Sequence, residues 1–571
     1  MMKGIGVSPG ISIGRAFVIS KAATTFSGVQ LTTNEDIAAG ISKFEAAVVS
    51  ASAEIEAIKM DLNLTLSADE LNILEIQVEL INDPQIKDDV VEKIETDKKT
   101  PGDALLEVIA NLVTVFEEMD DEYMSARSAD IRDAGARILK YLQNIPPPVI
   151  PTFNGDVIII ADDISPSETM TMDLQHVRGF ATRAGSKTSH TAIIAKAKGI
   201  PAVVACGDDV MMAVEGDLIV LDGATGFIHI NPDESALNDY KLKRDALASE
   251  TEKLKGLKDV PSITTDGVSV HLEVNISGID DMLLGFENGG EGVGLLRTEL
   301  LFMNRDSFPT EDEQFEFYKS IALQSKNNPV IVRTIDIGGD KQLSYFNIDA
   351  ELNPFLGYRA IRICLDRPEI FITQLKAILR ASVFGKLKIM FPMIANVQEI
   401  RAAKKLLEQA KYELTIQNIS FNANIKVGIM IEIPSAAVTA DILAKEVDFF
   451  SIGTNDLCQY TLAVDRMNEK ISHLYDTYNP GVLRLIGNVI EQGAKNNIPV
   501  GMCGEVAGDP LATLLLLGMG LKEFSMGPAA IPVIKKIIIS NSETKAKQVF
   551  STVMQMDNST DILAYLRQVT T

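Results

Sequence analysis

The sequence predicts a multidomain α/β protein: a small α/β domain interrupted by a helical block, followed by a C-terminal (β/α)8 barrel of the TIM type. Three observations predict this architecture. Strand-like runs flank a long stretch of helical periodicity, a highly charged helical segment follows them, and eight further strand-like runs then alternate with helical patterns. At 571 residues, of which 46% are hydrophobic, the chain is long enough for about three folded domains.

The helical block extends from Thr33 to Leu142, where glycine is rare and apolar residues recur at helical spacing. The spacing is clearest in Ile41, Phe44, Ala47, Val48 and Ala51. Consecutive prolines, Pro146 to Pro148, end this pattern because proline cannot continue a helix. β-type runs lie before the block at 11–19 and after it at 156–161, 200–205 and 217–222. We expect the first run to join the later ones in one sheet, which makes the block an insertion.

The second half of the chain begins with a charged segment, residues 234–258, that is rich in helix formers. It predicts a linker helix, although a surface helix of the next domain would fit the same pattern. The predicted barrel strands are 268–275, 292–296, 330–335, 387–393, 427–433, 447–452, 498–502 and 523–526. We therefore predict an α/β domain at 1–20 and 148–232, a helical domain at 21–147, a linker helix at 233–261 and the barrel at 262–571.

Charge and composition narrow the class of protein. The formal net charge of −25 and the pI near 4.7 disfavour binding to nucleic acid or to an anionic membrane surface. The longest apolar run, 511–521, is too short to span a bilayer, and the N-terminus has no signal-peptide pattern. The cysteines are scattered without a CxxC pair, at Cys206, Cys364, Cys458 and Cys503. We expect a cytoplasmic protein with reduced thiols.

Charged and polar residues stand where the predicted barrel strands end. They are Arg297, Arg333, Asp336, Glu432, Asn455, Asp456, Arg466 and Cys503. In a barrel these positions converge on the C-terminal face, where such folds place their chemistry. Arginines grip phosphate and carboxylate groups bidentately, and carboxylates with substrate oxygens suit Mg²⁺. Any one of these residues alone could be a structural ion pair or a buried thiol, but together they predict a site for a small anion carrying a phosphate and a carboxylate.

One histidine of the five has a distinctive setting. His190 follows a polar, glycine-containing loop and immediately precedes a helical pattern at 191–198. Backbone N–H groups at a helix N-terminus, with the hydroxyls of Thr188, Ser189 and Thr191, could bind a phosphoryl group beside the imidazole. A neutral imidazole is a competent nucleophile near neutral pH. The alternative is a helix-capping loop that happens to contain a histidine.

Long motifs in the barrel half resemble a known family. They are Gly-Val-Gly-Leu-Leu-Arg-Thr-Glu from Gly292, Arg-Thr-Ile-Asp-Ile-Gly-Gly-Asp-Lys from Arg333, Asn-Pro-Phe-Leu-Gly-Tyr-Arg-Ala-Ile-Arg from Asn353, Asp-Phe-Phe-Ser-Ile-Gly-Thr-Asn-Asp-Leu from Asp448, and Gly-Met-Cys-Gly-Glu from Gly501. With the His190 segment, they resemble enzyme I of the bacterial sugar phosphotransferase system, the phosphoenolpyruvate–protein phosphotransferases. The resemblance extends over essentially the whole chain.

The resemblance implies roles for individual residues. His190 would carry the phosphoryl group on Nε2. Phosphoenolpyruvate would be bound by Arg297, Arg333, Asn455, Asp456 and Arg466. Glu432 and Asp456 would ligate Mg²⁺, and Cys503 would protonate the enolate carbon to release pyruvate, a step for which a positioned thiol is chemically suited.

The resemblance also implies partners. The helical insertion would dock the phosphocarrier protein HPr, which the acidic run 69–95 suits, and the barrel would form a homodimer. The sequence departs from the family in its histidine loop, at Ser186, Lys187 and Lys196, where a lysine offers a point charge in place of an arginine fork. In the helical block, Gln77 stands where a histidine is expected.

Three alternatives compete with this interpretation. Relatives that use ATP, such as pyruvate phosphate dikinase and phosphoenolpyruvate synthase, need a nucleotide-binding domain for which we expect no room in the chain. The sequence also has no GxxxxGK[ST] segment before the histidine region. A catalytically silent sensor would not need every catalytic position to be filled. A metal–enolate lyase on the same barrel would not explain His190.

Overall fold

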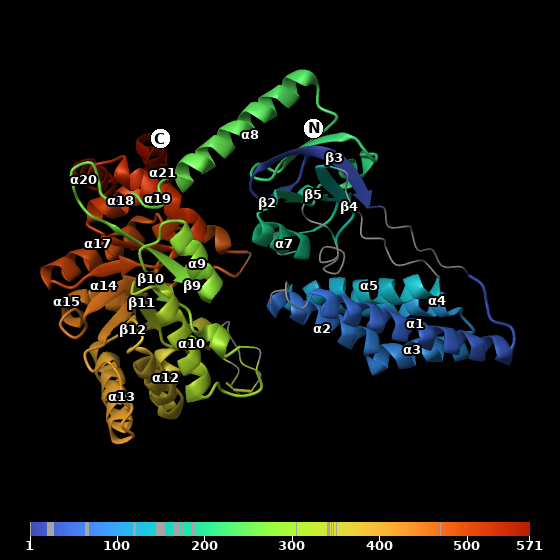
Figure 1. Ribbon diagram of the computed structural model, residues 1–571, viewed down its shortest axis with the longest axis horizontal. Coiled ribbons are helices and arrows are strands. Elements are labelled where there is room, and N and C mark those ends of the chain that lie inside the picture. The colour runs from blue at the N-terminus through green and yellow to red at the C-terminus, as the bar shows by residue number, and fades with distance from the viewer. Residues whose placement is uncertain are drawn as a thin grey trace. The chain divides into compact units, whose positions relative to one another are not determined.

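The computed structural model describes residues 2–19, 28–62, 68–117, 122–143, 155–164, 172, 176–185, 189–303, 305–339, 343, 345–346, 348–349, 351–468 and 470–570. The chain divides into two compact units, Met1–Ser249 and Glu250–Thr571 (Figure 1).

The helical block of the first unit consists of amphipathic helices, as the periodicity predicts. They are α1 (Asn34–Leu62), α2 (Ala68–Asn82), α3 (Pro84–Thr96), α4 (Pro101–Glu117) and α5 (Glu122–Leu142). Phe44, Val48 and Ala51 are buried at helical spacing on α1 and belong to one shared core with residues of the other helices. Asp83 caps α3 by accepting hydrogen bonds from two backbone N–H groups, so the turn between α2 and α3 is set locally.

The other part of the first unit is an eight-stranded sheet with the order β1-β8-β7-β3-β4-β5-β6-β2. Its strands are β1 (Met2–Lys3), β2 (Ile5–Ser8), β3 (Ile11–Ile19), β4 (Val157–Ala161), β5 (Val177–Thr182), β6 (Ala202–Val204), β7 (Leu218–Asp222) and β8 (Phe227–Ile230). Strands β3 and β4 are parallel neighbours although the whole helical block lies between them in sequence. The predicted insertion is therefore confirmed.

Strand β5 was not predicted. Arg178 and Gly179 interrupt its short apolar run, so its sequence has little strand signal. The neighbouring segment approaches Gly179 closely, since a Cβ added at this position would lie 3.3 Å from the Pro201 carbonyl oxygen. The lack of a side chain at Gly179 permits this approach. The close approach of two backbones, and not side-chain propensity, decides this strand.

The second unit is a closed barrel of parallel strands in the order β10-β11-β12-β13-β14-β15-β16-β9. The strands are β9 (His271–Ile276), β10 (Val293–Leu296), β11 (Pro329–Arg333), β12 (Lys386–Phe391), β13 (Lys426–Ile431), β14 (Phe449–Ile452), β15 (Val500–Met502) and β16 (Glu523–Met526). Each overlaps one of the eight predicted runs. The prediction of a TIM-type barrel is confirmed.

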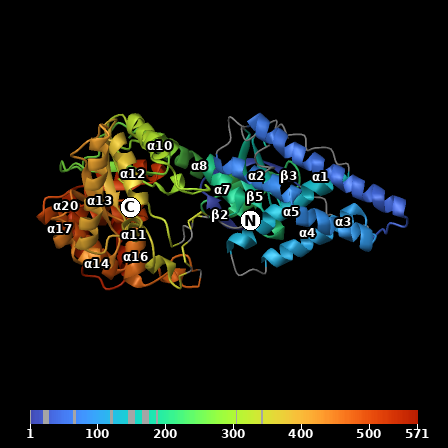
Figure 2. The same ribbon diagram turned by 90° about the horizontal axis from the view of Figure 1, so that it is seen from below.

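The long charged helix α8 (Glu234–Lys255) precedes the barrel, and further helices cover it. These are α9 (Ile279–Glu287), α10 (Glu311–Gln324), α11 (Ile361–Asp366), α12 (Pro368–Ala381), α13 (Val397–Ile416), α14 (Pro434–Val438), α15 (Ala440–Leu443), α16 (Thr454–Leu462), α17 (Pro480–Lys495), α18 (Pro510–Met519), α19 (Ile531–Ile539), α20 (Glu543–Val553) and α21 (Ser559–Thr570). Figure 2 shows α10, α12, α13, α14 and α17 arranged around the outside of this unit.

The apolar run 511–521 forms most of α18, which is buried against the barrel. No helix in the described ranges has both the length and the apolar character that crossing a membrane requires.

The barrel interior is filled by a small cluster of its own, separate from the larger core between strands and helices. It consists of Leu295, Ile331, Met390, Met430, Phe449 and Cys503. Gly428 on β13 leaves the space that the Phe449 ring occupies, since an added Cβ would lie 2.5 Å from two ring atoms. The cluster forms a packed layer under the C-terminal mouth of the barrel.

We predict that Gly428→Ala lowers the free energy of unfolding by about 1–3 kcal/mol, because the new methyl group overpacks the barrel against Phe449. The matched control is Gly487→Ala in α17, where an added Cβ meets no atom within 4 Å. This control should raise stability by up to about 1 kcal/mol through helix propensity. Urea unfolding followed by circular dichroism checks both signs, and equal effects of the two substitutions would contradict the packing argument.

Candidate active site

The C-terminal mouth of the barrel collects the residues that the sequence analysis placed at strand ends. Arg333 is the last residue of β11, Glu432 follows β13, and Cys503 follows β15. Asn455 and Asp456 lie in the first turn of α16, which begins just after β14. Because all strands of the barrel are parallel, these ends meet at one face. Arg297 follows β10 at the same face.

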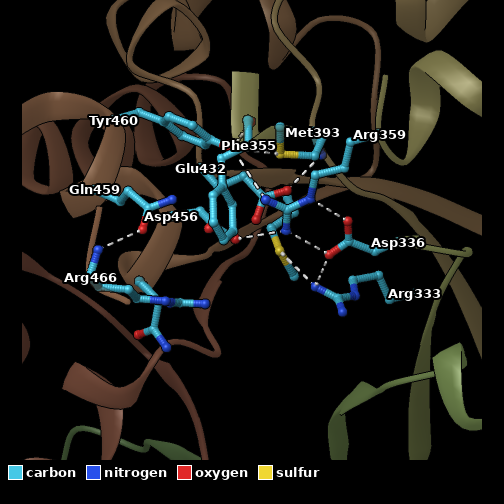
Figure 3. A network of polar contacts seen from close by, with 12 residues as sticks. Arg333, Asp336, Phe355, Arg359, Met393, Glu432, Asp456, Gln459, Tyr460 and Arg466 are labelled. Carbon is cyan, nitrogen blue, oxygen red and sulfur yellow. Dashed lines mark hydrogen bonds and ion pairs between the residues drawn. The ribbon is translucent and has the colours of Figure 1, made fainter. Parts of the chain in front are cut away.

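Two arginines lie on either side of the buried carboxylate of Asp336 (Figure 3). Nη1 of Arg333 is 3.1 Å from Asp336 Oδ2. Arg359 binds the same carboxylate with two hydrogen bonds, from Nε to Oδ1 at 2.9 Å and from Nη2 to Oδ2 at 3.1 Å. Glu299 pairs with the other side of the Arg333 guanidinium. Burial opposes both positive charges, but the surrounding carboxylates outweigh it and raise the pKa of each arginine, so both stay charged.

Arg359 also connects this network to α16. Its Nη2 donates to Asp456 Oδ2 at 3.2 Å, and its Nη1 donates to the Tyr460 hydroxyl at 3.2 Å. The Phe355 ring lies below the guanidinium, 5.9 Å from its central carbon. We did not predict a role for Arg359 from the sequence, although Arg359 lies in one of the family-like motifs. It meets Asp336, 23 positions earlier, only in the folded barrel.

Glu432 and Asp456 are the two carboxylates that could hold a metal ion. Glu432 is buried, and its Oε1 accepts a hydrogen bond of 2.6 Å from the Met393 N–H. Burial, together with the negative charges of Asp456 and Asp336, raises the pKa of Glu432. The Oδ1 atom of Asp456 is buried without a hydrogen-bond partner among the described residues. An unpaired carboxylate oxygen beside a second carboxylate fits a cation such as Mg²⁺.

The described residues contain no group of three or more histidine, cysteine or acidic side chains that could hold a metal ion by themselves. Mg²⁺ is often held by one or two carboxylates, with its other ligands supplied by substrate oxygens and water. Glu432 and Asp456 therefore fit a site that is completed by a phosphorylated substrate.

The thiol of Cys503 is buried in the barrel mouth and forms no disulfide. Its Sγ lies 3.9 Å from the Ile452 carbonyl oxygen. Burial raises the pKa of Cys503 above its ordinary value, although a hydrogen bond with Ser451 and the charge of Arg333 act in the opposite direction. The thiol is therefore protonated at neutral pH, which is the form that can act as an acid.

Asn455 and Arg466 are held by polar contacts near the start and end of α16. Asn455 exchanges two hydrogen bonds with Glu505, one to its side chain at 3.2 Å and one from its N–H at 3.1 Å. The Arg466 N–H donates to Gln459 Oε1 at 3.2 Å. The Tyr475 hydroxyl donates to the Asn455 carbonyl at 3.3 Å, and the positive charge of Arg466 acts to lower the pKa of the same hydroxyl.

Gln374, a fully buried residue of α12, supports the strand ends from outside the barrel and was not predicted. Its Oε1 accepts from the Ile335 N–H at 2.9 Å, and its Nε2 donates to Thr298 Oγ1 at 3.2 Å. The Thr298 hydroxyl in turn donates to the Arg333 carbonyl at 3.0 Å. One amide thus holds the backbone from the Arg333 carbonyl to the Ile335 N–H, just after Arg333, a role that no local sequence pattern indicates.

His190 is the first residue of α7 (His190–Lys198), so its expected place at a helix N-terminus agrees with the backbone. Its side chain lies outside the part of the chain that the structure describes, as do Ser186, Lys187 and Thr188. Thr191 is buried and its hydroxyl donates to the Ile164 carbonyl at 3.3 Å. This hydroxyl is therefore engaged within the domain, contrary to the expectation that it would face a phosphoryl group.

Two other positions named for their departure from the family differ in exposure. Lys196 is exposed on α7. Gln77 is buried inside the helical block, where its Nε2 donates to the Asp130 carbonyl at 3.3 Å. Gln77 therefore contributes to the core of the block and does not lie on a docking surface.

Comparisons with known proteins agree with the geometry of the barrel mouth. Residues 251–543 match the PEP-utilising enzyme, PEP-binding domain family. Residues 3–127 match the PEP-utilising enzyme, N-terminal family, and residues 153–226 match the PEP-utilising enzyme, mobile domain family.

The similar proteins include full-length relatives. The phosphoenolpyruvate-protein phosphotransferase of Staphylococcus carnosus (strain TM300) is 43% identical over 569 residues, which cover 100% of this chain and 99% of that protein. The protein of the same name from Bacillus subtilis (strain 168) is 43% identical, with 99% of each chain covered. A solution structure titled Enzyme I (nEIt) is 36% identical, covers 43% of this chain and 100% of that one, and has a TM-score of 0.38.

The two relatives match over nearly the full length of both chains. The three family matches follow one another along the chain, from the N-terminal family to the PEP-binding domain family. The chain therefore belongs to the phosphoenolpyruvate-protein phosphotransferase family, enzyme I of the bacterial sugar phosphotransferase system.

Proposed function

We propose that this chain moves the phosphoryl group of phosphoenolpyruvate onto His190 and then onto the phosphocarrier protein HPr, releasing pyruvate as the first step of sugar uptake. One observation supports this most directly. Charged arginines, two carboxylates suited to a cation and a protonated thiol follow the strands at one barrel mouth, and each is needed by one part of a phosphoenolpyruvate molecule.

In this proposal, Arg297, Arg333, Asn455, Asp456 and Arg466 bind the substrate. The guanidinium groups grip its phosphate and carboxylate, because a planar fork matches two oxygens at once. The buried ion pairs around Arg333 keep its charge and orientation fixed before the substrate arrives.

Glu432 and Asp456 would hold Mg²⁺ through their carboxylate oxygens. When bound, the ion would neutralise charge on the phosphoryl and enolate oxygens. The Oδ1 atom of Asp456 accepts no hydrogen bond from any residue that the structure describes, which supports its assignment as a ligand.

The proposed phosphoryl transfer needs only His190 as the nucleophile and Cys503 as the proton donor. The imidazole of His190 would attack phosphorus, the bond from phosphorus to the enol oxygen would break, and the enolate of pyruvate would remain. Cys503 would then give its proton to the methylene carbon, and the resulting thiolate would regain a proton from solvent. The raised pKa of the thiol supports an acid role for it.

Partners and location complete the proposal. HPr would dock on the helical domain, 21–147, whose acidic α2 and α3 suit a basic partner face. The barrel domain, 262–571, would form a homodimer, and the α/β domain, 1–20 with 148–232, would carry His190. A cytoplasmic location is part of the proposal and is consistent with four free thiols.

His190→Ala should abolish labelling of the chain by phosphoenolpyruvate that carries ³²P, because no phosphoryl acceptor remains. The unaltered chain with Mg²⁺ should give an acid-labile, base-stable phosphoprotein without ATP. His271→Ala, an exposed histidine at the start of β9, is the control and should label normally. Labelling that survives His190→Ala would show that another residue is the nucleophile.

Cys503→Ala should lower kcat for pyruvate formation by about 10²-fold or more while changing KM much less, because the thiol acts after the substrate is bound. Steady-state kinetics with HPr separate the two constants. Cys206→Ala, which removes a buried thiol of the other unit, should leave both unchanged. A parallel loss in binding and turnover would argue against the acid role.

Arg359→Leu should lower the free energy of unfolding by about 3–5 kcal/mol, because it leaves the buried carboxylates of Asp336 and Asp456 without their shared cation. Arg401→Leu removes an exposed ion pair with Glu446 and should cost less than about 1 kcal/mol. Urea unfolding measures both variants. Similar values for the two would mean that the buried network contributes nothing beyond a surface pair.

A further inference from the structure

Asn275, on β9, has a side chain that connects two other strands inside the barrel. Its Oδ1 accepts a hydrogen bond of 2.7 Å from the Ser525 hydroxyl of β16. Its Nδ2 donates to the carbonyl oxygen of Cys503 at 2.9 Å. In the barrel, β16 lies between β9 and β15. The Asn275 amide therefore extends past β16 to Cys503, the residue after β15.

The bond from Ser525 sets the direction of the amide. A hydroxyl that donates to Oδ1 holds the amide oxygen on its own side, so the NH₂ group is presented to Cys503. The Ser525 hydroxyl thus fixes which side of the amide faces Cys503. Without this hydroxyl, the Asn275 amide would be free to rotate.

The backbone of Cys503 is held on both of its peptide groups. Its N–H donates to the Ile452 carbonyl of β14 at 3.1 Å, while its carbonyl accepts from Asn275. The next residue, Gly504, is packed so closely that an added Cβ would lie 1.9 Å from Thr454 Oγ1. The segment therefore has little room to move toward α16. The Gly504 N–H makes a long contact of 3.4 Å with the Ile452 carbonyl, and Asn275 holds the opposite, carbonyl side of the same peptide.

We infer that Asn275 is a positioning residue, which holds the Cys503 peptide so that the thiol points at one face of the bound enolate carbon. This inference rests on the proposed role of Cys503 as the acid. If the thiol is displaced by about 1 Å, it is no longer aligned with the carbon that must receive the proton. Such misplacement can slow a reaction roughly 10²-fold.

The configuration of the new methyl group reports this positioning. Phosphoenolpyruvate with one deuterium at C3 in the Z position, turned over in tritiated water, gives pyruvate whose methyl group carries three hydrogen isotopes. If one thiol donates the proton, the methyl group forms with a single configuration. If the enolate leaves the site before it is protonated, solvent adds the proton to both faces.

The test is a single turnover of the full chain with Mg²⁺ and the labelled substrate. We expect Asn275→Ala to slow pyruvate formation roughly 10- to 100-fold and to give a largely racemic methyl group, with ³²P labelling at His190 and the substrate concentration for half-saturation nearly unchanged. Asn275→Asp keeps the size and the bond from Ser525, but a carboxylate cannot donate to the Cys503 carbonyl, so it should show the same loss. If the Ala variant does not fold, the Asp variant alone tests the positioning role of Asn275.

The control is Asn488→Ala in α17, which removes another partly buried amide bonded to a backbone carbonyl, that of Ala437 at 2.7 Å. It should keep the rate and the single configuration. If Cys503→Ala also keeps the single configuration, the proposed acid is wrong. If Cys503→Ala loses it while both Asn275 variants retain it, the positioning role is overturned and the proposed function stands. If the Asn275 variants raise only the substrate concentration for half-saturation, Asn275 is a substrate ligand, which also overturns the inference.

Discussion

The buried ion-pair network around Asp336 is the constraint on which the barrel mouth depends. Asp336 is fully buried, and Arg359, Arg333 and Glu432 are each no more than 6% exposed. Charges at such depth are tolerated only when they are paired and hydrogen-bonded. Arg359 pairs with both Asp336 and Asp456, so it joins the loop after β11 to the first turn of α16. The site is therefore organised before any substrate enters it.

Backbone strain accompanies these contacts at the mouth. Met393 has a φ of 57°, and its N–H donates to Glu432. Ala360, next to Arg359, has a φ of 52° with a ψ of −120°, a region that glycine favours, and its N–H bonds to the Ile337 carbonyl. Such conformations cost about 1–3 kcal/mol each and persist where the surroundings hold them. Here the strained residues adjoin the groups that carry the ion pairs, which links local strain to the placement of charge.

Much of the fold was predictable from periodicity and from breaker residues. The helical block, the barrel strands and the charged helix α8 have strong local signals, because alternating or helical burial leaves its pattern in the sequence itself. Strand β5 was missed because Arg178 and Gly179 weaken its pattern, and its place depends on the close approach of the segment at Pro201. The strand ends of the barrel also located Arg333, Glu432 and Cys503 in advance, since parallel strands direct their ends to one face.

What the sequence by itself determined was the architecture, the family resemblance and the residue types at the barrel mouth. Only the tertiary structure decided which groups support them. Gln374 and Asn275 have ordinary sequence surroundings, and Arg359 lies in a family-like motif that does not indicate its contacts. The partners of all three lie in other segments of the chain. The physical reason is that burial raises the cost of every unpaired polar group, so the fold, and not the local sequence, selects the side chain that must satisfy it.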